Sequence, residues 1–233
     1  MRLLLLAAGW HLRWLRWRPA QLLLLPGGVL LALMADRSGS PAAQAASFVA
    51  PAVIVAMTLG WNDSRLRSYL RSTASRRSGA LLRIALEGWL LPLAAAMALA
   101  EAVVTSMSAA GMVDLRWQSH LTLAFTALAA ASAMAFTRGR RQKIAASFIG
   151  ALLVLQLLLP PGDAPVAELL LPTAWPALSM AAGEGSGAAF HADIYMGLSM
   201  LLGVGVSVAL GRRGLARPEV PQLSAPSPET QGG

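Results

Sequence analysis

LTLAFTALAAASAMAFTRGRRQKIAASFIGALLVLQLLL, residues 121–159, holds two apolar runs on either side of a short basic segment. The apolar runs occupy 121–136 and 144–159, and the segment 137–143 between them carries three arginines and a lysine. Arg and Lys next to a membrane span resist export across the bilayer and therefore collect on the cytoplasmic side. The stretch predicts two membrane-spanning helices joined by a tight cytoplasmic loop.

The same alternation of apolar runs and sided charge extends over the whole chain. Six spans are predicted, at about 19–35, 42–61, 80–104, 121–136, 144–159 and 192–210. All but two of the 19 Arg and Lys residues lie in the terminal segments and alternate loops, the exceptions being Arg37 and Arg116. We therefore predict an all-α integral membrane protein whose six-span transmembrane domain covers 19–213, with both termini in the cytoplasm.

The composition agrees with a lipid environment. Hydrophobic residues make up 56% and charged residues 13% of the 233 residues, against roughly 25% charged residues in a soluble domain. The net charge of +8 follows the cytoplasmic loops, which favours anionic lipid headgroups and acidic partner surfaces over nucleic acid. Arginine richness with abundant Ala, Leu and Gly is typical of a high-GC bacterial genome. The expected location is the bacterial cytoplasmic (inner) membrane.

Three segments outside the spans have their own patterns. Residues 1–18 place tryptophans and leucines beside arginines, which predicts a cytoplasmic interfacial amphipathic helix. The outer loop 163–191 is apolar but broken by Pro172 and Pro176 around Trp175, which predicts short helices half sunk in the outer leaflet. The tail 214–233 is rich in Pro, Ser and Gly, and we expect it to be disordered in the cytoplasm.

Two acids fall inside predicted spans. Glu87 and Glu101 both lie in the third predicted span, where an ionisable group is costly and marks a candidate functional site. Glu87 has a structural alternative, because Arg83 lies one helical turn earlier and can pair with it. Glu101 lies nearer the outer end, where it can simply reach the headgroups. The two acids are therefore intramembrane polar candidates with open roles.

Small residues are dense in three of the predicted spans. They are Ala94–Ala96 with Ala98, Ala127–Ala135, and Gly203 with Gly205. Small faces let helices approach closely. We favour packing within one subunit over a specific dimer face as the use of these residues.

Motifs that would make this chain an enzyme are absent from its sequence. It contains no G-x-x-x-x-G-K-[ST] phosphate loop, no H-E-x-x-H, no G-x-S-x-G and no cysteine. We therefore predict no catalytic residue, no metal and no cofactor on this chain. His120 and His191 both lie on the predicted outer side, which leaves an external metal or proton site open beside the plainer interpretation of two interfacial histidines.

The layout resembles the membrane subunit of a bacterial ABC exporter of the type-2 (ABC-2-like) family. Residues 169–178, LLLPTAWPAL, are similar to the leucine–proline–tryptophan stretch that often precedes the last span in these permeases. In this resemblance, 1–18 is the elbow helix, 62–71 the coupling helix and 163–189 the re-entrant helices. The loop after Gly60 has Asp63-Ser64-Arg65 instead of the Arg-Glu-x-Gly-Thr-like motif common there.

The resemblance implies a mechanism and partners. A second permease subunit, identical or related, would pair with this one, and separate ABC ATPase subunits carrying ATP and Mg would dock beneath. The chain would export a hydrophobic or amphipathic substrate. The expected ATPase contacts are the coupling residues Asp63, Arg65, Leu66, Arg67, Tyr69, Leu70 and Arg71. Pro172, Trp175 and Pro176 would belong to the outer re-entrant segment. A secondary transporter, or a structural membrane subunit of a larger assembly, stays open as the alternative.

Overall fold

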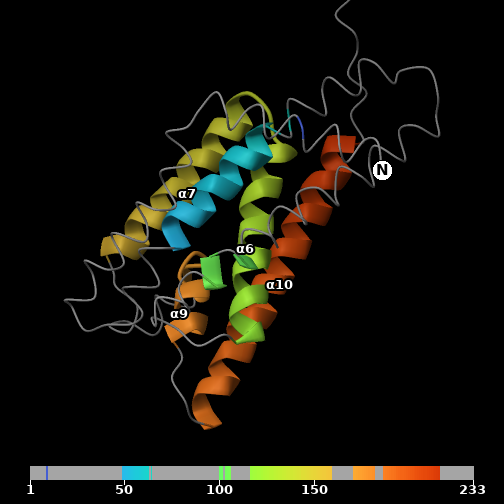
Figure 1. Ribbon diagram of the computed structural model, residues 1–233. Helices are drawn as coiled ribbons and strands as arrows, with labels where there is room; N and C mark the ends of the chain where they lie inside the picture. Colours follow the sequence, from blue (N-terminus) through green and yellow to red (C-terminus); the bar gives the residue numbers. More distant parts are fainter. Residues whose placement is uncertain are drawn as a thin grey trace, which may run out of the picture.

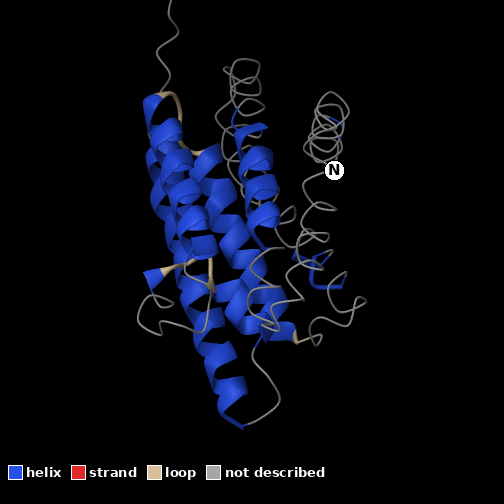
Figure 2. Cartoon of the chain, turned by 90° about the vertical axis from the view of Figure 1, so that its left-hand side faces the viewer, coloured by secondary structure: helices blue, strands red, loops and turns tan. Residues whose placement is uncertain are grey.

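The computed structural model describes residues 9, 49–62, 64, 100–101, 103–105, 116–158, 170–181 and 186–215. These residues are helical apart from the connections at 116, 136–139 and 171–174. The prediction of an all-α chain is confirmed for them, and Figure 2 shows this part as helices without a strand. The named helices are α6 (Trp117–Ala135), α7 (Arg140–Leu158), α9 (Trp175–Ala181) and α10 (Ser186–Leu215), together with the helix Val49–Asn62.

Three of these helices run in the same direction. In Figure 1 the helix Val49–Asn62, α6 and α10 all point one way, and α7 returns. The contacts between α6 and α10 agree. Gln118 donates to Asp193 at 3.2 Å, and the hydroxyls of Ser132 and Ser207 are 2.8 Å apart. The two contacts are about 21 Å apart along each helix at 1.5 Å rise per residue, so α6 and α10 pack parallel and in register.

A tight connection reverses the chain between α6 and α7. Gly139 has a φ of 58°, a left-handed conformation that glycine adopts without steric cost. The backbone N–H of Phe136 donates to the Ser132 carbonyl at 3.0 Å, which closes the end of α6. The side chain of Gln142 donates to the Met134 carbonyl at 2.8 Å and ties the start of α7 to the end of α6. These bonds hold the predicted short loop as a helical hairpin.

The helix ends differ from the predicted ones. α6 begins at Trp117 instead of 121, α7 begins at Arg140 instead of 144, and α10 covers Ser186–Leu215 instead of 192–210. The predicted ends followed the last apolar residue. A helix continues past that point because its backbone N–H and C=O groups stay paired within it. The predicted first span and elbow helix lie outside the described residues apart from helical Gly9, as do residues 80–99 of the third span and 216–233 of the tail. Gly214 and Leu215, which were expected in the disordered tail, belong to α10.

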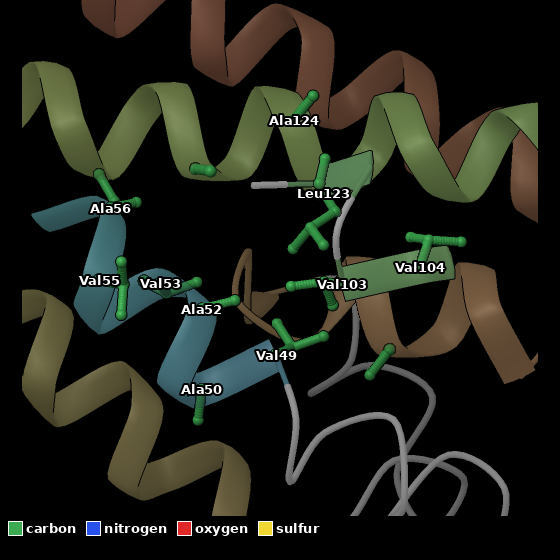
Figure 3. Close-up of a cluster of buried hydrophobic side chains, with 14 of the residues drawn as sticks. Val49, Ala50, Ala52, Val53, Val55, Ala56, Val103, Val104, Leu123 and Ala124 are labelled. Carbon is green, nitrogen blue, oxygen red and sulfur yellow. The ribbon is translucent and has the colours of Figure 1, made fainter. Parts of the chain in front are cut away.

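The core consists of small side chains that let backbones meet. Figure 3 shows Val49, Val103 and Val104 gathered around Leu123 of α6, and all four are buried. A Cβ atom added to Gly60 would lie 2.1 Å from the Ala131 carbonyl oxygen of α6. At that distance only a residue without a side chain fits. The helix Val49–Asn62 therefore packs on α6 backbone to backbone.

α6 also packs closely on α10, again at a glycine. A Cβ atom added to Gly203 of α10 would lie 2.6 Å from the Phe125 carbonyl oxygen. Buried Ser199 and Ser207 precede and follow Gly203 by four residues, one helical turn each way. Such small residues at four-residue spacing are typical of close helix packing in lipid. The predicted close approach at Gly203 falls within one chain, whereas Gly205 has nothing within 4 Å.

The outer surfaces of α7 and α10 are apolar and their inner faces hold polar groups. On α7, Phe148 is 64% exposed while Gln156 is 1% exposed. On α10, Leu201 is 74% exposed while Ser199 is fully buried. A helix on a water-soluble protein shows the reverse order. Among the described residues one helix is long and apolar enough to cross a membrane, over Phe190–Gly211.

Candidate functional site

The segment before α10 folds into a turn and a short helix, α9, which packs against both α6 and α10. Figure 1 shows α9 beside the lower half of α6. The Ala174 N–H donates to the Leu171 carbonyl at 2.9 Å, and the chain then enters α9 at Trp175. Pro176 lies in the first turn, where a missing N–H leaves no helical bond unmade. Trp175 is 7% exposed and Pro176 is fully buried. The predicted short helix at this position is present as α9, and it is buried within the described part of the chain.

Hydroxyl groups attach α9 to α6. Ser119 donates to the Ser179 carbonyl at 3.1 Å, and the two serine hydroxyls are 3.4 Å apart. Thr122 donates to the Gln118 carbonyl at 2.6 Å, and its hydroxyl is 3.5 Å from that of Ser179. Ser119, Thr122 and Ser179 are all fully buried. Because an apolar surrounding offers these groups no other partner, the contacts fix the position of α9.

An apolar cavity of about 180 Å³ lies beside this segment. It is open to the outside and is lined by the helix Val49–Asn62, α6, α7, α10 and the turn before α9. The lining residues are Val53, Thr126, Ala129, Ala130, Ala133, Ala145, Phe148, Ile149, Leu152, Pro172, Thr173, Leu202 and Val206. Elements far apart in sequence thus combine to form one pocket. Pro172 and Thr173 are the members of the predicted outer segment that line it.

The two threonines that line this cavity differ in their hydrogen bonds. The hydroxyl of Thr126 donates to the Thr122 carbonyl at 2.9 Å. The hydroxyl of Thr173 is buried and has no hydrogen-bond partner. A buried hydroxyl without a partner is costly, and native structures contain few of them. Thr173 is therefore the side chain of this lining whose hydroxyl lacks a hydrogen-bond partner, and protein atoms cover that oxygen in this structure.

The end of the bundle at the start of α6 carries a second polar group. Nδ1 of His120 lies 2.9 Å from Oε2 of Glu101 without hydrogen-bond alignment, so the contact is an ion pair when the imidazole is protonated. The Glu101 side chain is 69% exposed. His191 instead lies edge-on to Phe190, with ring centroids 6.1 Å apart. Within the described ranges no three His, Asp or Glu side chains gather as a metal site would require.

Other predicted site residues lie outside the described part of the chain. These are Glu87 and the coupling residues Asp63, Arg65, Leu66, Arg67, Tyr69, Leu70 and Arg71. The helix before them is described as far as Asn62, and both Asn62 and the separately described Ser64 are buried. The coupling role therefore stays a prediction.

The predictions from the sequence did not include the hydroxyl groups that attach α9 to α6. Ser119, Thr122 and Thr126 stand at i, i+3 and i+7, which places them on one helical face. That spacing within an apolar run indicates a polar stripe on a helix that is otherwise apolar. Comparisons with protein-family models, with curated proteins and with solved structures found no match. Function is therefore inferred from the residues and contacts described above.

Proposed function

We propose that the chain is a multi-span protein of the bacterial inner membrane and the permease subunit of an ABC exporter. One observation carries the proposal: Val49–Asn62, α6 and α10 run parallel and α7 runs back. These are the second, fourth, sixth and fifth predicted spans. A chain that crosses a membrane six times must give its even spans one direction and its odd spans the other. The helix directions support that topology.

The charge distribution over the bundle gives further support. Exposed Arg138, Arg140, Arg141 and Lys143 surround the α6–α7 connection. Arg212 and Arg213 belong to the last turns of α10, which ends on the same side because α10 is parallel to α6. The other end holds the Glu101–His120 pair. Cations at one end of an apolar bundle are typical of the cytoplasmic side of a membrane protein.

The surfaces of α7 and α10 support a lipid neighbour. Water would disfavour Phe148 and Leu201 on the outside, whereas hydrocarbon accepts them and disfavours exposed glutamine or serine. The burial of Gln156 and Ser199 beneath these apolar faces fits a bilayer. The export role itself comes from the resemblance to type-2 ABC permeases, and the buried α9 before the last helix agrees with it.

The membrane topology can be tested with cysteine labelling, because the chain has no native cysteine. Trp117→Cys and Arg141→Cys place single thiols at exposed positions near the two ends of α6. In right-side-out vesicles a membrane-impermeant maleimide is expected to label Trp117→Cys. Arg141→Cys is expected to react only after permeabilisation. The cysteine-free parent serves as the blank, and equal labelling of both variants in sealed vesicles would contradict the topology.

Dependence on a separate ATPase can be tested by purification from the native membrane in mild detergent. A subunit with nucleotide-binding motifs is expected to copurify, and substrate efflux is expected to stop when its ATP hydrolysis is blocked. A Gly60→Ala variant, which carries a packing defect on α6, provides a check that recovery requires the folded chain. Recovery of the complete native complex without a nucleotide-binding subunit, or efflux by the isolated chain without ATP, would favour the secondary transporter instead.

A further inference from the structure

The cavity between α6, α7 and α10 combines an apolar wall with a single unused polar group. Thr173 is 4% exposed and its hydroxyl has no partner, while the Thr126 hydroxyl already donates within α6. The remaining lining side chains are alanine, valine, leucine, isoleucine, proline and phenylalanine. A 120° rotation of Thr173 about χ1 carries the hydroxyl to the position that its methyl group or its Cβ hydrogen occupied. The hydroxyl can therefore turn to meet a ligand.

Water and a hydrocarbon tail both fit this cavity poorly. A buried water needs about two to four polar partners, and the side chains here offer only two hydroxyls, one already used as a donor. The end of a lipid acyl chain would fill the space but leave Thr173 without a partner. A molecule with an apolar body and one hydrogen-bonding group satisfies both the wall and the threonine.

The size of the cavity limits the ligand further. An apolar cavity of about 150 Å³ holds benzene, so about 180 Å³ accepts a ring with one or two further heavy atoms. The lining carries no charged side chain, which disfavours an ion. Phe148 lines the cavity and is 64% exposed, so a route from the apolar surface of α7 leads past it.

We propose that this cavity is a binding site for a small neutral molecule, ring-sized and carrying one hydroxyl or carbonyl group that hydrogen-bonds to Thr173. The ligand enters from the apolar surface beside Phe148. The site does not depend on the proposed ABC partnership, because all its lining residues belong to this chain. The proposal applies both to a ligand that is transported and to one that stays bound.

The test compares two probes on the full chain in lipid nanodiscs. 4-Fluorophenol and 4-fluorotoluene have nearly the same shape, but only the phenol forms a strong hydrogen bond. Binding is followed by ¹⁹F NMR. Both probes also dissolve in the lipid, to the same extent for every variant. The signal measured with Ala133→Leu, in which the new side chain fills the cavity, gives this background and is subtracted. Ala145→Leu fills the cavity from α7 as a second variant, in case the first fails to fold.

The wild-type protein is expected to bind the phenol more tightly than the toluene by about 2- to 12-fold, which corresponds to a net hydrogen bond of about 0.5–1.5 kcal/mol. Thr173→Val is expected to remove that preference while keeping toluene binding. Thr126→Val, on the same wall, is expected to keep it. Both probes should lose specific binding in the filled variants.

Two results would overturn the proposal. If the filled variants retain both probes as the wild type does, the cavity is not the binding site. If the wild type binds the two probes equally and Thr173→Val changes neither, the cavity takes only hydrocarbon, such as an acyl chain. The failure of the ABC proposal would leave these results unchanged, since no ATPase takes part in the measurement.

Discussion

Substitution of Gly60 by alanine is expected to lower the free energy of unfolding by about 3 kcal/mol, at the upper end of the usual cost of overpacking a core. The new Cβ would lie 2.1 Å from the Ala131 carbonyl oxygen and within 3 Å of two further backbone atoms of Ala131. Backbone atoms cannot move aside as a flexible side chain would. The helix Val49–Asn62 must therefore shift away from α6. In detergent the melting temperature should fall by about 6–12 °C.

The control for this measurement is Gly150→Ala on α7. A Cβ atom at Gly150 meets nothing within 4 Å, and alanine is the better helix former by up to about 1 kcal/mol. Gly150→Ala should therefore melt at or slightly above the wild-type temperature. If Gly60→Ala behaved in the same way, the close packing of the helix Val49–Asn62 on α6 would be wrong.

Gly203→Ala and Gly205→Ala should differ although the two glycines are two residues apart on one helix. At Gly203 the added Cβ lies 2.6 Å from the Phe125 carbonyl oxygen, whereas at Gly205 it meets open space. We expect Gly203→Ala to lose about 2 kcal/mol of stability, within the range for overpacking. Gly205→Ala should lose none. Thermal unfolding of the two purified variants under the same conditions gives the comparison.

Separation of α10 from α6 would also break the contacts on either side of Gly203. The Ser132–Ser207 and Gln118–Asp193 hydrogen bonds both cross this interface. Gly203→Leu should therefore cost more than Gly203→Ala, because the larger side chain pushes the helices further apart. Equal stability of the Gly203 and Gly205 variants would contradict the described parallel packing of α6 and α10.

The sequence predicted the helical class and the α6–α7 hairpin for a clear reason. Apolar runs with basic residues between them, such as 121–159, have few other solutions in a bilayer. The helix ends could not be predicted in the same way. The predicted ends followed the polarity of the residues, whereas the helix α10 continues to Leu215 on its own hydrogen bonds.

The candidate site was much harder to predict. Pro172, Trp175 and Pro176 stood out by composition, and the expected setting was short helices half sunk in the outer leaflet. Trp175 is buried in a short helix whose Ser179 carbonyl accepts a hydrogen bond from the Ser119 hydroxyl of α6. Those partners are 60 residues apart in sequence, a pairing that no local pattern contains. The unused hydroxyl of Thr173 depends on neighbours in the same way.

By itself the sequence determined which segments avoid water and where the cations gather, because both are properties of single residues and their order along the chain. Only the tertiary structure decided that Gly203 is packed and Gly205 is open, and that Thr173 lines a cavity without a partner. Two residues along a helix turn the side chain by about 200°. Which of the two directions meets another backbone is settled by the neighbouring helix.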